Sequence, residues 1–306
     1  MAADDRARHQ AGVEQVRARR ETALRDPMGW LSLVGLHWLE PGEQRFGADG
    51  ANAIVLHAAE GSVPRVAGSL RVAGDQVTVH PADAALTVGG EPVRDGLVLL
   101  DEASEEGPTV LEVGSVRAYL IRRGAGRLAL RVKDSAAPAL REFSGLDYFP
   151  IDPAWRVAGR LNPAEPGATI AVPDIVGDLL TETTPGVVAF ELGGAVHRLH
   201  ALEAQPGHLW LVFGDATNGS ETYGGGRFLV TGAVQPDDSV EVDFNLAYNP
   251  PCVFSPHATC PLPPEGNRLA VRVEAGERMW TAPGLEHCGT PKAGTRPPRP
   301  AAPHRA

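Results

Sequence analysis

The chain has no apolar run that approaches the roughly 20 residues a helix needs to span a bilayer. Its 306 residues therefore predict no membrane-spanning helix. The first 21 residues are charged throughout and lack the apolar core of a secretory signal peptide. We expect a cytoplasmic protein without a membrane partner.

Cysteine is scarce, with only Cys252, Cys260 and Cys288 in the chain. A small, odd number in a chain of this length does not indicate a disulfide framework. Cys252 and Cys260 could pair on oxidation, but we expect two free thiols that pack as small apolar groups. Cys288 lies in a segment with few large apolar side chains, and we assign it no role.

Positive charge is also in short supply, because 28 lysines and arginines face 38 acidic residues. The formal net charge is −10 and the sequence pI is about 5.5. Nucleic-acid-binding domains usually carry a basic face, so no nucleic-acid partner is expected.

Several well-known catalytic patterns are missing. The chain has no G-x-S-x-G nucleophile elbow and no H-E-x-x-H zinc motif. It also lacks the alternation of strand and helix patterns that a parallel, doubly wound sheet requires. The sequence therefore gives no support for the best-known hydrolase mechanisms or for a dinucleotide-binding fold.

One helix is expected, over residues 4–25, and Pro27 ends it. Val13, Val16 and Leu24 give it a thin apolar stripe. We interpret its many arginines as a solvated face rather than a binding surface.

Short strands that end in Gly, Pro or Asp fill most of the remaining chain, a pattern typical of an all-β sandwich or barrel. The first series includes SLRVAG, QVTVHP, VRAYLIRRG and RLALRVKD, and the second includes WRVAGRL, VVAFELGG, HLWLVFGD and RFLVTG. We predict β units over residues 28–133 and 138–280, joined by a connection within 134–150. A single larger barrel is the alternative. From residue 281 the composition predicts a disordered tail.

Residues 213–268 concentrate glycine, proline, acids, tyrosine and two cysteines between short apolar runs. Loops of this composition on a strand scaffold are where binding and catalytic sites are commonly built. We therefore place the candidate site here.

The triple glycine 224–226 can be interpreted in two ways. Consecutive glycines let backbone N–H groups approach an anion, as in phosphate-binding loops. Those loops need a helix after the glycines, whereas here the strand pattern RFLVTG follows. A tight turn or bulge is the favoured interpretation.

Three acids of this stretch, Asp215, Glu221 and Asp243, are candidate general acids or bases, or ligands of a hard cation. In VEVDFNLAY, a strand would place Asp243 and Asn245 on one face, opposite an apolar face. The alternative role is structural, since carboxylates often cap turns by accepting backbone hydrogen bonds.

Cys252, His257 and Cys260 form a C-x4-H-x2-C pattern. Thiolate and imidazole are zinc ligands and also form nucleophile–base pairs. A fourth ligand is missing, and six prolines between 250 and 264 stiffen the loop, so a structural role is favoured. We predict no metal or other cofactor.

Longer motifs add a resemblance. The runs DATNGSETYGGGRFL, DFNLAYNPPC and CPLPPEGNRLAVRVEAGE, with GWLSLVGLHWLEPGEQRFGAD and FSGLDYFPIDPAWRVAGRL, resemble a bacterial domain-of-unknown-function family, number sixteen-eighty-four. The resemblance covers about residues 28–280 and implies no settled reaction. That family often has Ser-Gly-Lys where this chain has Asn218-Gly219-Ser220, so any charge from that lysine is absent here.

RFGADGANAIVL, VGGEPV and LEVGSVRAYLI are similar to the strand order of forkhead-associated phosphopeptide-binding sandwiches. That resemblance would require an arginine, a Ser-x-x-His and an asparagine where this chain has Ala48, Ser62 with Arg65, and Gly89. Losing these donors removes most phosphate contacts. The resemblance therefore implies a shared scaffold without phosphothreonine recognition.

We expect an enzyme of hydrolytic or acid–base type, or a binder of a small molecule, with its site in the second β unit. In an enzyme, Asp215 or Glu221 would be the general base and Arg227 would orient an anionic group. The alternative is a non-catalytic interaction module in which these loops form a rigid clasp. The candidate catalytic residues are Asp215, Glu221, Tyr223, Arg227, Asp243 and His257, and the candidate binding residues are Asn245, Tyr248, Asn249 and Cys252. The oligomeric state is not indicated.

Overall fold

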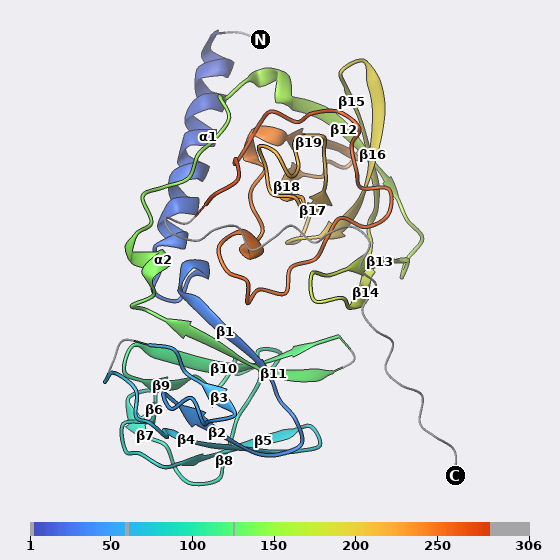
Figure 1. The fold of residues 1–306 in the computed structure, drawn as a ribbon. Helices are drawn as coiled ribbons and strands as arrows, with labels where there is room; N and C mark the ends of the chain where they lie inside the picture. Colours follow the sequence, from blue (N-terminus) through green and yellow to red (C-terminus); the bar gives the residue numbers. More distant parts are fainter. Residues whose placement is uncertain (1–2, 59–60, 125, 282–306) are drawn as a thin grey trace.

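The computed structural model describes residues 3–58, 61–124 and 126–281 (Figure 1). One long helix, α1 (Ala3–Leu24), precedes a series of β-strands within these residues. The predicted all-β class with an N-terminal helix is confirmed. The tail predicted from residue 281 lies, from residue 282 onward, outside the described residues, as does Cys288.

The strands before residue 135 form two sheets that share one apolar core. The sheet orders are β1-β11-β10-β9-β6-β7 and β3-β2-β4-β5-β8. The strands are β1 (Leu33–Trp38), β2 (Gly42–Gly47), β3 (Ile54–Val55), β4 (Gly68–Ala73), β5 (Gln76–Pro81), β6 (Thr87–Val88), β7 (Glu91–Pro92), β8 (Leu97–Val98), β9 (Leu111–Val113), β10 (Val116–Arg123) and β11 (Arg127–Asp134). Their alternating patterns turn Leu70 and Val79 of one sheet toward Leu120 and Leu130 of the other. We call this group of strands the first unit.

The later strands form a second, curved sheet of order β18-β17-β16-β15-β12-β19, with β13 and β14 as a separate hairpin. They are β12 (Arg156–Pro163), β13 (Thr169–Pro173), β14 (Leu179–Thr183), β15 (Gly186–Leu192), β16 (Ala195–Glu203), β17 (His208–Phe213), β18 (Arg227–Ala233) and β19 (Ser239–Asp243). The curvature brings the outer strands together, since a Cβ on Gly232 of β18 would lie 3.3 Å from that of Glu241 on β19. Among the described residues, none of these strands pairs with the first unit.

The residues after β19 wrap around this second unit without adding a strand to its sheet (Figure 1). They contain two short 3-10 helices, η3 (Phe244–Leu246) and η4 (Pro251–Val253). The Leu269 amide donates to the Gly214 carbonyl at 2.8 Å, and the Glu277 amide donates to Ala247 at 2.8 Å. We call residues 244–281 the C-terminal segment, because it supplies much of the site described below.

Helix α1 lies along the second unit, with its C-terminal end near the first unit (Figure 1). Val13 and Leu24 of the predicted stripe are buried, whereas Val16 is 39% exposed. Such a narrow apolar contact supplies little of the burial that usually docks a surface helix.

Polar side chains complete the docking of α1. His9 Nε2 lies 2.6 Å from Asp243 Oδ2, and the Arg17 guanidinium donates to the Phe149 carbonyl at 3.1 Å. Arg20 has a side chain only 19% exposed and is paired with Glu277. The interpretation of these arginines as a purely solvated face is therefore wrong for Arg17 and Arg20. Because the apolar stripe is thin, ion pairs and hydrogen bonds hold the side of the helix that carries Arg17 and Arg20.

The two units meet through apolar and polar contacts. A buried cluster joins Leu33 of β1 to Val212 and Phe228 of the second unit. Arg123 of β10 donates to Thr259 Oγ1 at 3.0 Å.

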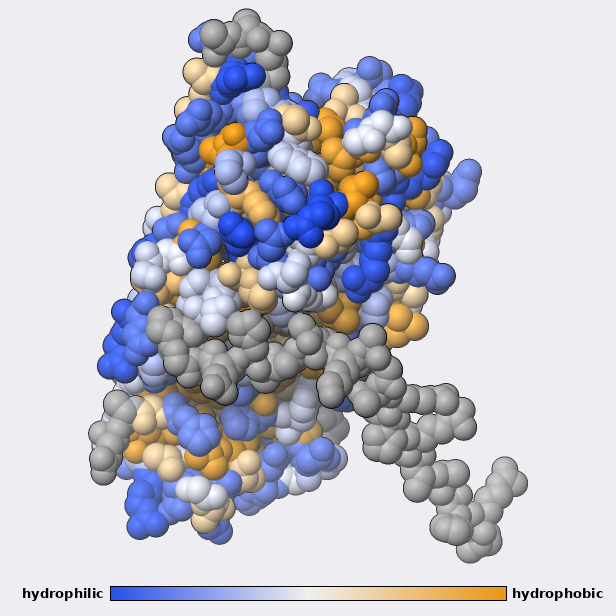
Figure 2. Space-filling model, turned by 45° about the horizontal axis from the view of Figure 1, so that its top comes forward, coloured by the Kyte–Doolittle hydropathy of each residue, from blue (hydrophilic) through white to orange (hydrophobic). Residues whose placement is uncertain are grey.

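Hydrophilic residues cover most of the face shown in Figure 2, and its hydrophobic areas are small and interrupted. Among residues 3–58, 61–124 and 126–281, no helix is both long and apolar enough to cross a membrane.

Three histidines lie close together where the units meet. Burial lowers the pKa of His37 on β1, and the nearby His257 and His57 lower it further. Burial and His57 likewise lower the pKa of His257. Because these pKa values fall below the ordinary 6.5, the folded state binds fewer protons than the unfolded state under mildly acidic conditions.

The His257→Gln variant should lose less stability on acidification than the unmodified protein. The two histidines lower the unfolding free energy as the pH falls through about 6.5, because protons then bind preferentially to the unfolded chain. Urea denaturation at about pH 7.5 and about pH 5.5 measures this loss. An unchanged loss in the variant would contradict the prediction.

Candidate functional site

A cavity of about 790 Å³ lies between α1 and the second unit, and we call it the helix cavity. Helix α1, strand β18 and the C-terminal segment all contribute to it. Its polar lining comprises Arg17, Arg19, Arg20, Tyr148, Gln205, His208, Thr231, Asn245, Tyr248 and Glu277. Three arginines therefore face one carboxylate.

An ion pair closes one side of the helix cavity. Arg20 Nε donates to Glu277 Oε1 at 3.0 Å, and the same guanidinium donates to the Asn249 carbonyl at 2.8 Å. The Asn249 amide in turn donates to Glu277 Oε2 at 2.7 Å. Burial raises the pKa of Glu277, while Arg20 and the Asn249 amide oppose the rise. Both carboxylate oxygens are thus engaged, and Arg20 is held 5.1 Å over the Tyr248 ring.

Two polar atoms of the helix cavity have no protein partner. The Arg17 guanidinium lies 4.3 Å over the Tyr148 ring. Arg17 Nε and the Tyr148 hydroxyl are buried and make no hydrogen bond. Burial lowers the pKa of Arg17 and raises that of Tyr148. Buried polar groups are nearly always hydrogen-bonded, so this unsatisfied pair at a cavity requires an explanation.

Asp215 and Arg227, the predicted base and anion-orienting residue, lie in the protein interior and line none of the cavities described here. Their side chains form an ion pair of 2.9 Å and are both fully buried. Asp215 Oδ1 also accepts from the Thr217 amide at 2.8 Å and from its hydroxyl at 2.6 Å. Asp215 therefore acts as a cap within its own loop.

Both terminal nitrogens of Arg227 donate to the backbone of the C-terminal segment, whereas its Nε makes no hydrogen bond. Its guanidinium donates to the carbonyls of Val273 at 2.8 Å and Glu277 at 3.2 Å, and also to Ala275. Phe213 lies under the charge at 5.6 Å. A guanidinium enclosed in this way does not reach the solvent or a ligand.

The glycine run forms a tight turn. The Gly226 amide donates to the Tyr223 carbonyl at 3.1 Å. A Cβ on Gly225 would lie 2.5 Å from the Tyr223 ring, and one on Gly226, at φ +93°, would lie 2.5 Å from the Phe213 carbonyl. The chain's own atoms thus occupy the space that glycine leaves, and the strand β18 follows as its sequence pattern predicts.

Asp243 and Asn245 are close together, but not as neighbours on a strand. Strand β19 ends at Asp243, whose Oδ1 accepts from the Asn245 amide at 3.0 Å and its side-chain nitrogen at 2.8 Å. The predicted continuation of the strand is wrong here, because a carboxylate that accepts from the backbone two residues ahead favours a cap and a turn. Asp243 also holds His9 of α1, and Asn245 lines the helix cavity.

Glu221 and His257 lie at separate places. Glu221 is 30% exposed and pairs with Arg272 and, at 3.3 Å, with Arg278 on the surface. His257 belongs to the histidine cluster between the units. With Tyr223 packed against Gly225, the six candidate catalytic residues do not converge on one cavity.

Cys252 and Cys260 form a disulfide with a Cα–Cα distance of 6.2 Å. This corrects the expectation of two free thiols, because the proline-rich loop returns the chain to the separation that a disulfide bridges. The two sulfurs face each other, not His257. Within the described residues, no group of three or more His, Cys, Asp or Glu side chains is arranged to hold a metal ion.

Of the predicted binding residues, Asn245 and Tyr248 line the helix cavity and Asn249 supports the Arg20–Glu277 pair. The sequence did not predict Arg17, Arg20, Tyr148 and Glu277, which complete the lining of the helix cavity. Arg17 and Arg20 are three positions apart and so share a face of the helix, which was an available signal. Tyr148 and Glu277 lie within the quoted family motifs, but no local pattern distinguishes them from other residues there.

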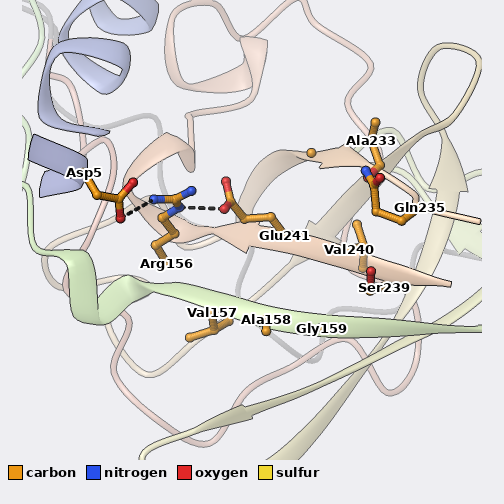
Figure 3. Close-up of a pocket in the computed structure, with 11 residues that line it drawn as sticks. Asp5, Arg156, Val157, Ala158, Gly159, Ala233, Gln235, Ser239, Val240 and Glu241 are labelled. Atoms are coloured by element: carbon orange, nitrogen blue, oxygen red, sulfur yellow. Dashed lines mark hydrogen bonds and ion pairs between the residues drawn. The ribbon is translucent and has the colours of Figure 1, made fainter. Parts of the chain in front are cut away.

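Another cavity, of about 660 Å³, runs along β12 and β19 (Figure 3). Arg156 lies in it between two carboxylates, at 3.7 Å from Asp5 and 2.6 Å from Glu241 (Figure 3). The hydrogen bond that Arg156 donates to Glu241 raises the pKa of Arg156. Because its charge is neutralised within the protein, this cavity is a weaker candidate than the helix cavity.

The Asp215→Asn variant should lose about 3–5 kcal/mol of unfolding free energy, because it leaves the buried Arg227 charge without its counter-ion. Glu43→Gln is the matched control, since its 3.8 Å pair with Arg71 is exposed. That change should cost at most about 1 kcal/mol. Urea denaturation compares the two variants, and equal losses would contradict the structural role of Asp215.

Comparison with known proteins adds a family. A protein-family model described as "Protein of unknown function (DUF1684)" matches residues 141–278. An uncharacterized protein from Haloarcula marismortui, solved by NMR in solution, is 34% identical over 48% of this chain and 80% of its own length, with a TM-score of 0.39. The comparison with curated proteins finds no match.

The matched range contains the C-terminal motifs on which the resemblance rested, and the whole of the central one. The opening motif lies outside it. The similarity to forkhead-associated sandwiches concerns residues before the match and stays a prediction. Over residues 141–278, the chain belongs to the DUF1684 family of proteins of unknown function.

Proposed function

We propose that the protein binds a small anionic molecule in the helix cavity. The observation that carries this proposal is the pair of unpartnered buried atoms, Arg17 Nε and the Tyr148 hydroxyl, on two residues that line one cavity. A ligand carboxylate or phosphate oxygen would accept from both groups. Hydrogen bonds to a charged group contribute about 1.5–3 kcal/mol each, which would favour an anion over a neutral ligand at this place.

The surroundings of Arg17 suit an anion. Arg17, Arg19 and Arg20 outnumber Glu277, the one carboxylate in the lining. Glu277 neutralises Arg20, which leaves Arg17 and Arg19 as the charges that an anion would meet. The volume of about 790 Å³ falls within the range typical of small-molecule sites.

Proton transfer by Glu277 is the second candidate function. Burial raises the pKa of this carboxyl, and perturbed carboxyls are frequent at enzyme sites. Arg20 and the Asn249 amide hold both of its oxygens, however, and this favours an anchoring role. Binding is therefore better supported than catalysis. The alternative hypothesis is an interaction module in which these loops form a rigid clasp. The loop 215–222 is hydrogen-bonded within itself and supports the C-terminal segment, which is a structural role inside the chain.

Thermal-shift measurements with acetate, succinate, citrate and inorganic phosphate test the proposal. An anion present at about 100 times its Kd adds roughly 2.7 kcal/mol to the stability of the folded state, which raises the melting temperature by several degrees. Arg17→Gln and Tyr148→Phe should weaken this anion about tenfold or more, because each removes a donor to it.

Arg8→Gln is the control, since Arg8 lies on the same helix with a side chain 72% exposed. It should bind like the unmodified protein. The proposal fails if none of the anions raises the melting temperature, or if the shift persists in both cavity variants.

A further inference from the structure

A separate cavity of about 390 Å³ lies where α1 and the two units meet, and we call it the junction cavity. Its cationic lining consists of Arg20 from α1, Arg123 from β10 and Arg131 from β11. No carboxylate is among the residues that line it. It shares Arg20 and Tyr248 with the helix cavity and otherwise has its own lining.

Arg131 is the unusual residue of this cavity. It is 4% exposed, and its Nε makes no hydrogen bond. The nearest carboxylate oxygen, Glu102 Oε2, lies 3.8 Å from Nη1, while the other oxygen of Glu102 pairs with Arg123. A buried guanidinium with so little compensation is costly unless something else accepts its hydrogen bonds.

A second buried cation lies beside Arg131. Lys133 follows two residues later on β11, and alternation places both side chains on one face of the strand. Lys133 is 8% exposed and donates to the Met28 carbonyl. Burial and Arg131 together lower its pKa. Lys133 does not line the junction cavity and has Asp26 nearby, so it contributes only to the positive potential around Arg131.

Flat aromatic rings form the rest of the wall. Trp210 and Phe228 meet edge to face with centroids 4.9 Å apart, and Phe228 meets Tyr248 in the same way at 5.7 Å. Trp30 lies 5.7 Å from the Arg131 guanidinium carbon. These rings offer apolar faces against which a planar ligand would stack.

We infer that the junction cavity binds a planar aromatic carboxylate, with its carboxylate at Arg131 and its ring against Trp210 and Phe228. The guanidinium fork of Arg131 matches the two oxygens of a carboxylate. The volume suits a ligand of about one ring system. Arg131 does not line the helix cavity, so variants at this residue separate this site from the one proposed above.

Isothermal titration of the full chain tests the inference with three probes. Benzoate carries both ring and carboxylate, benzyl alcohol carries the ring alone, and inorganic phosphate carries the charge alone. Benzoate should bind at least about tenfold more tightly than either of the others, since only it uses both walls. Quenching or a shift of tryptophan fluorescence should accompany it, because Trp30 and Trp210 line the cavity.

Arg131→Gln should weaken benzoate about tenfold or more, and Arg131→Lys should weaken it less, because lysine keeps the charge but loses the fork. Arg117→Gln on the neighbouring strand β10 is the matched control, and Arg17→Gln tests the helix cavity alone. Neither should change the affinity. Melting temperatures of the free variants verify their folding, and if Arg131→Gln is unfolded, Arg131→Lys decides.

The inference is overturned if benzoate does not bind, if phosphate binds the Arg17→Gln variant as tightly as benzoate does, or if the folded Arg131 variants bind benzoate unchanged. It is also overturned if Arg17→Gln abolishes benzoate binding, since the ligand would then occupy the helix cavity. Loss of anion binding in Arg17→Gln alone concerns only the function proposed above.

Discussion

One buried guanidinium organises the second unit. Arg227 is fully enclosed, and only Asp215 and the backbone carbonyls of the C-terminal segment accept its hydrogen bonds. A charge in such a place is tolerated only when nearby groups compensate it, and these bonds engage both terminal nitrogens of Arg227, while its Nε makes no hydrogen bond. The bonds to Val273, Ala275 and Glu277 therefore determine where the C-terminal segment returns across the sheet. The loop 215–222 supports this arrangement by holding Asp215.

The position of the C-terminal segment determines how α1 docks. Arg227 holds the backbone of Glu277, whose carboxylate then meets Arg20 of the helix. Long polar side chains, instead of a wide apolar stripe, connect α1 to the second unit. The helix cavity lies beside these side chains. Arg20 and Tyr248 also border the junction cavity, so the same two residues form a wall of both. A ligand in either cavity would therefore contact residues that hold α1 against the rest of the protein.

Much of the fold could be predicted from local patterns. Alternation in QVTVHP or HLWLVFGD reports strands directly, because the side-chain period of a strand is two. The helix over residues 4–25 differs from the observed one by a residue at each end. The site could be predicted only in part. Tyr248 and Asn245 lay in the stretch already singled out. Asp215 and Asp243, however, are caps, since a carboxylate near backbone amides usually serves the nearest turn, and Glu221 forms surface ion pairs.

By itself, the sequence determined the class of the fold, the strand segments, the long N-terminal helix and residues 213–268 as a place of interest. These depend on periodicity and turn residues within a few positions. Only the tertiary structure decided that Arg17 and Arg20 face inward, that Cys252 and Cys260 are bonded, and that Arg131 is buried without a full set of partners. Those outcomes depend on which distant segments meet, and burial and charge pairing across such distances leave no local pattern in the chain.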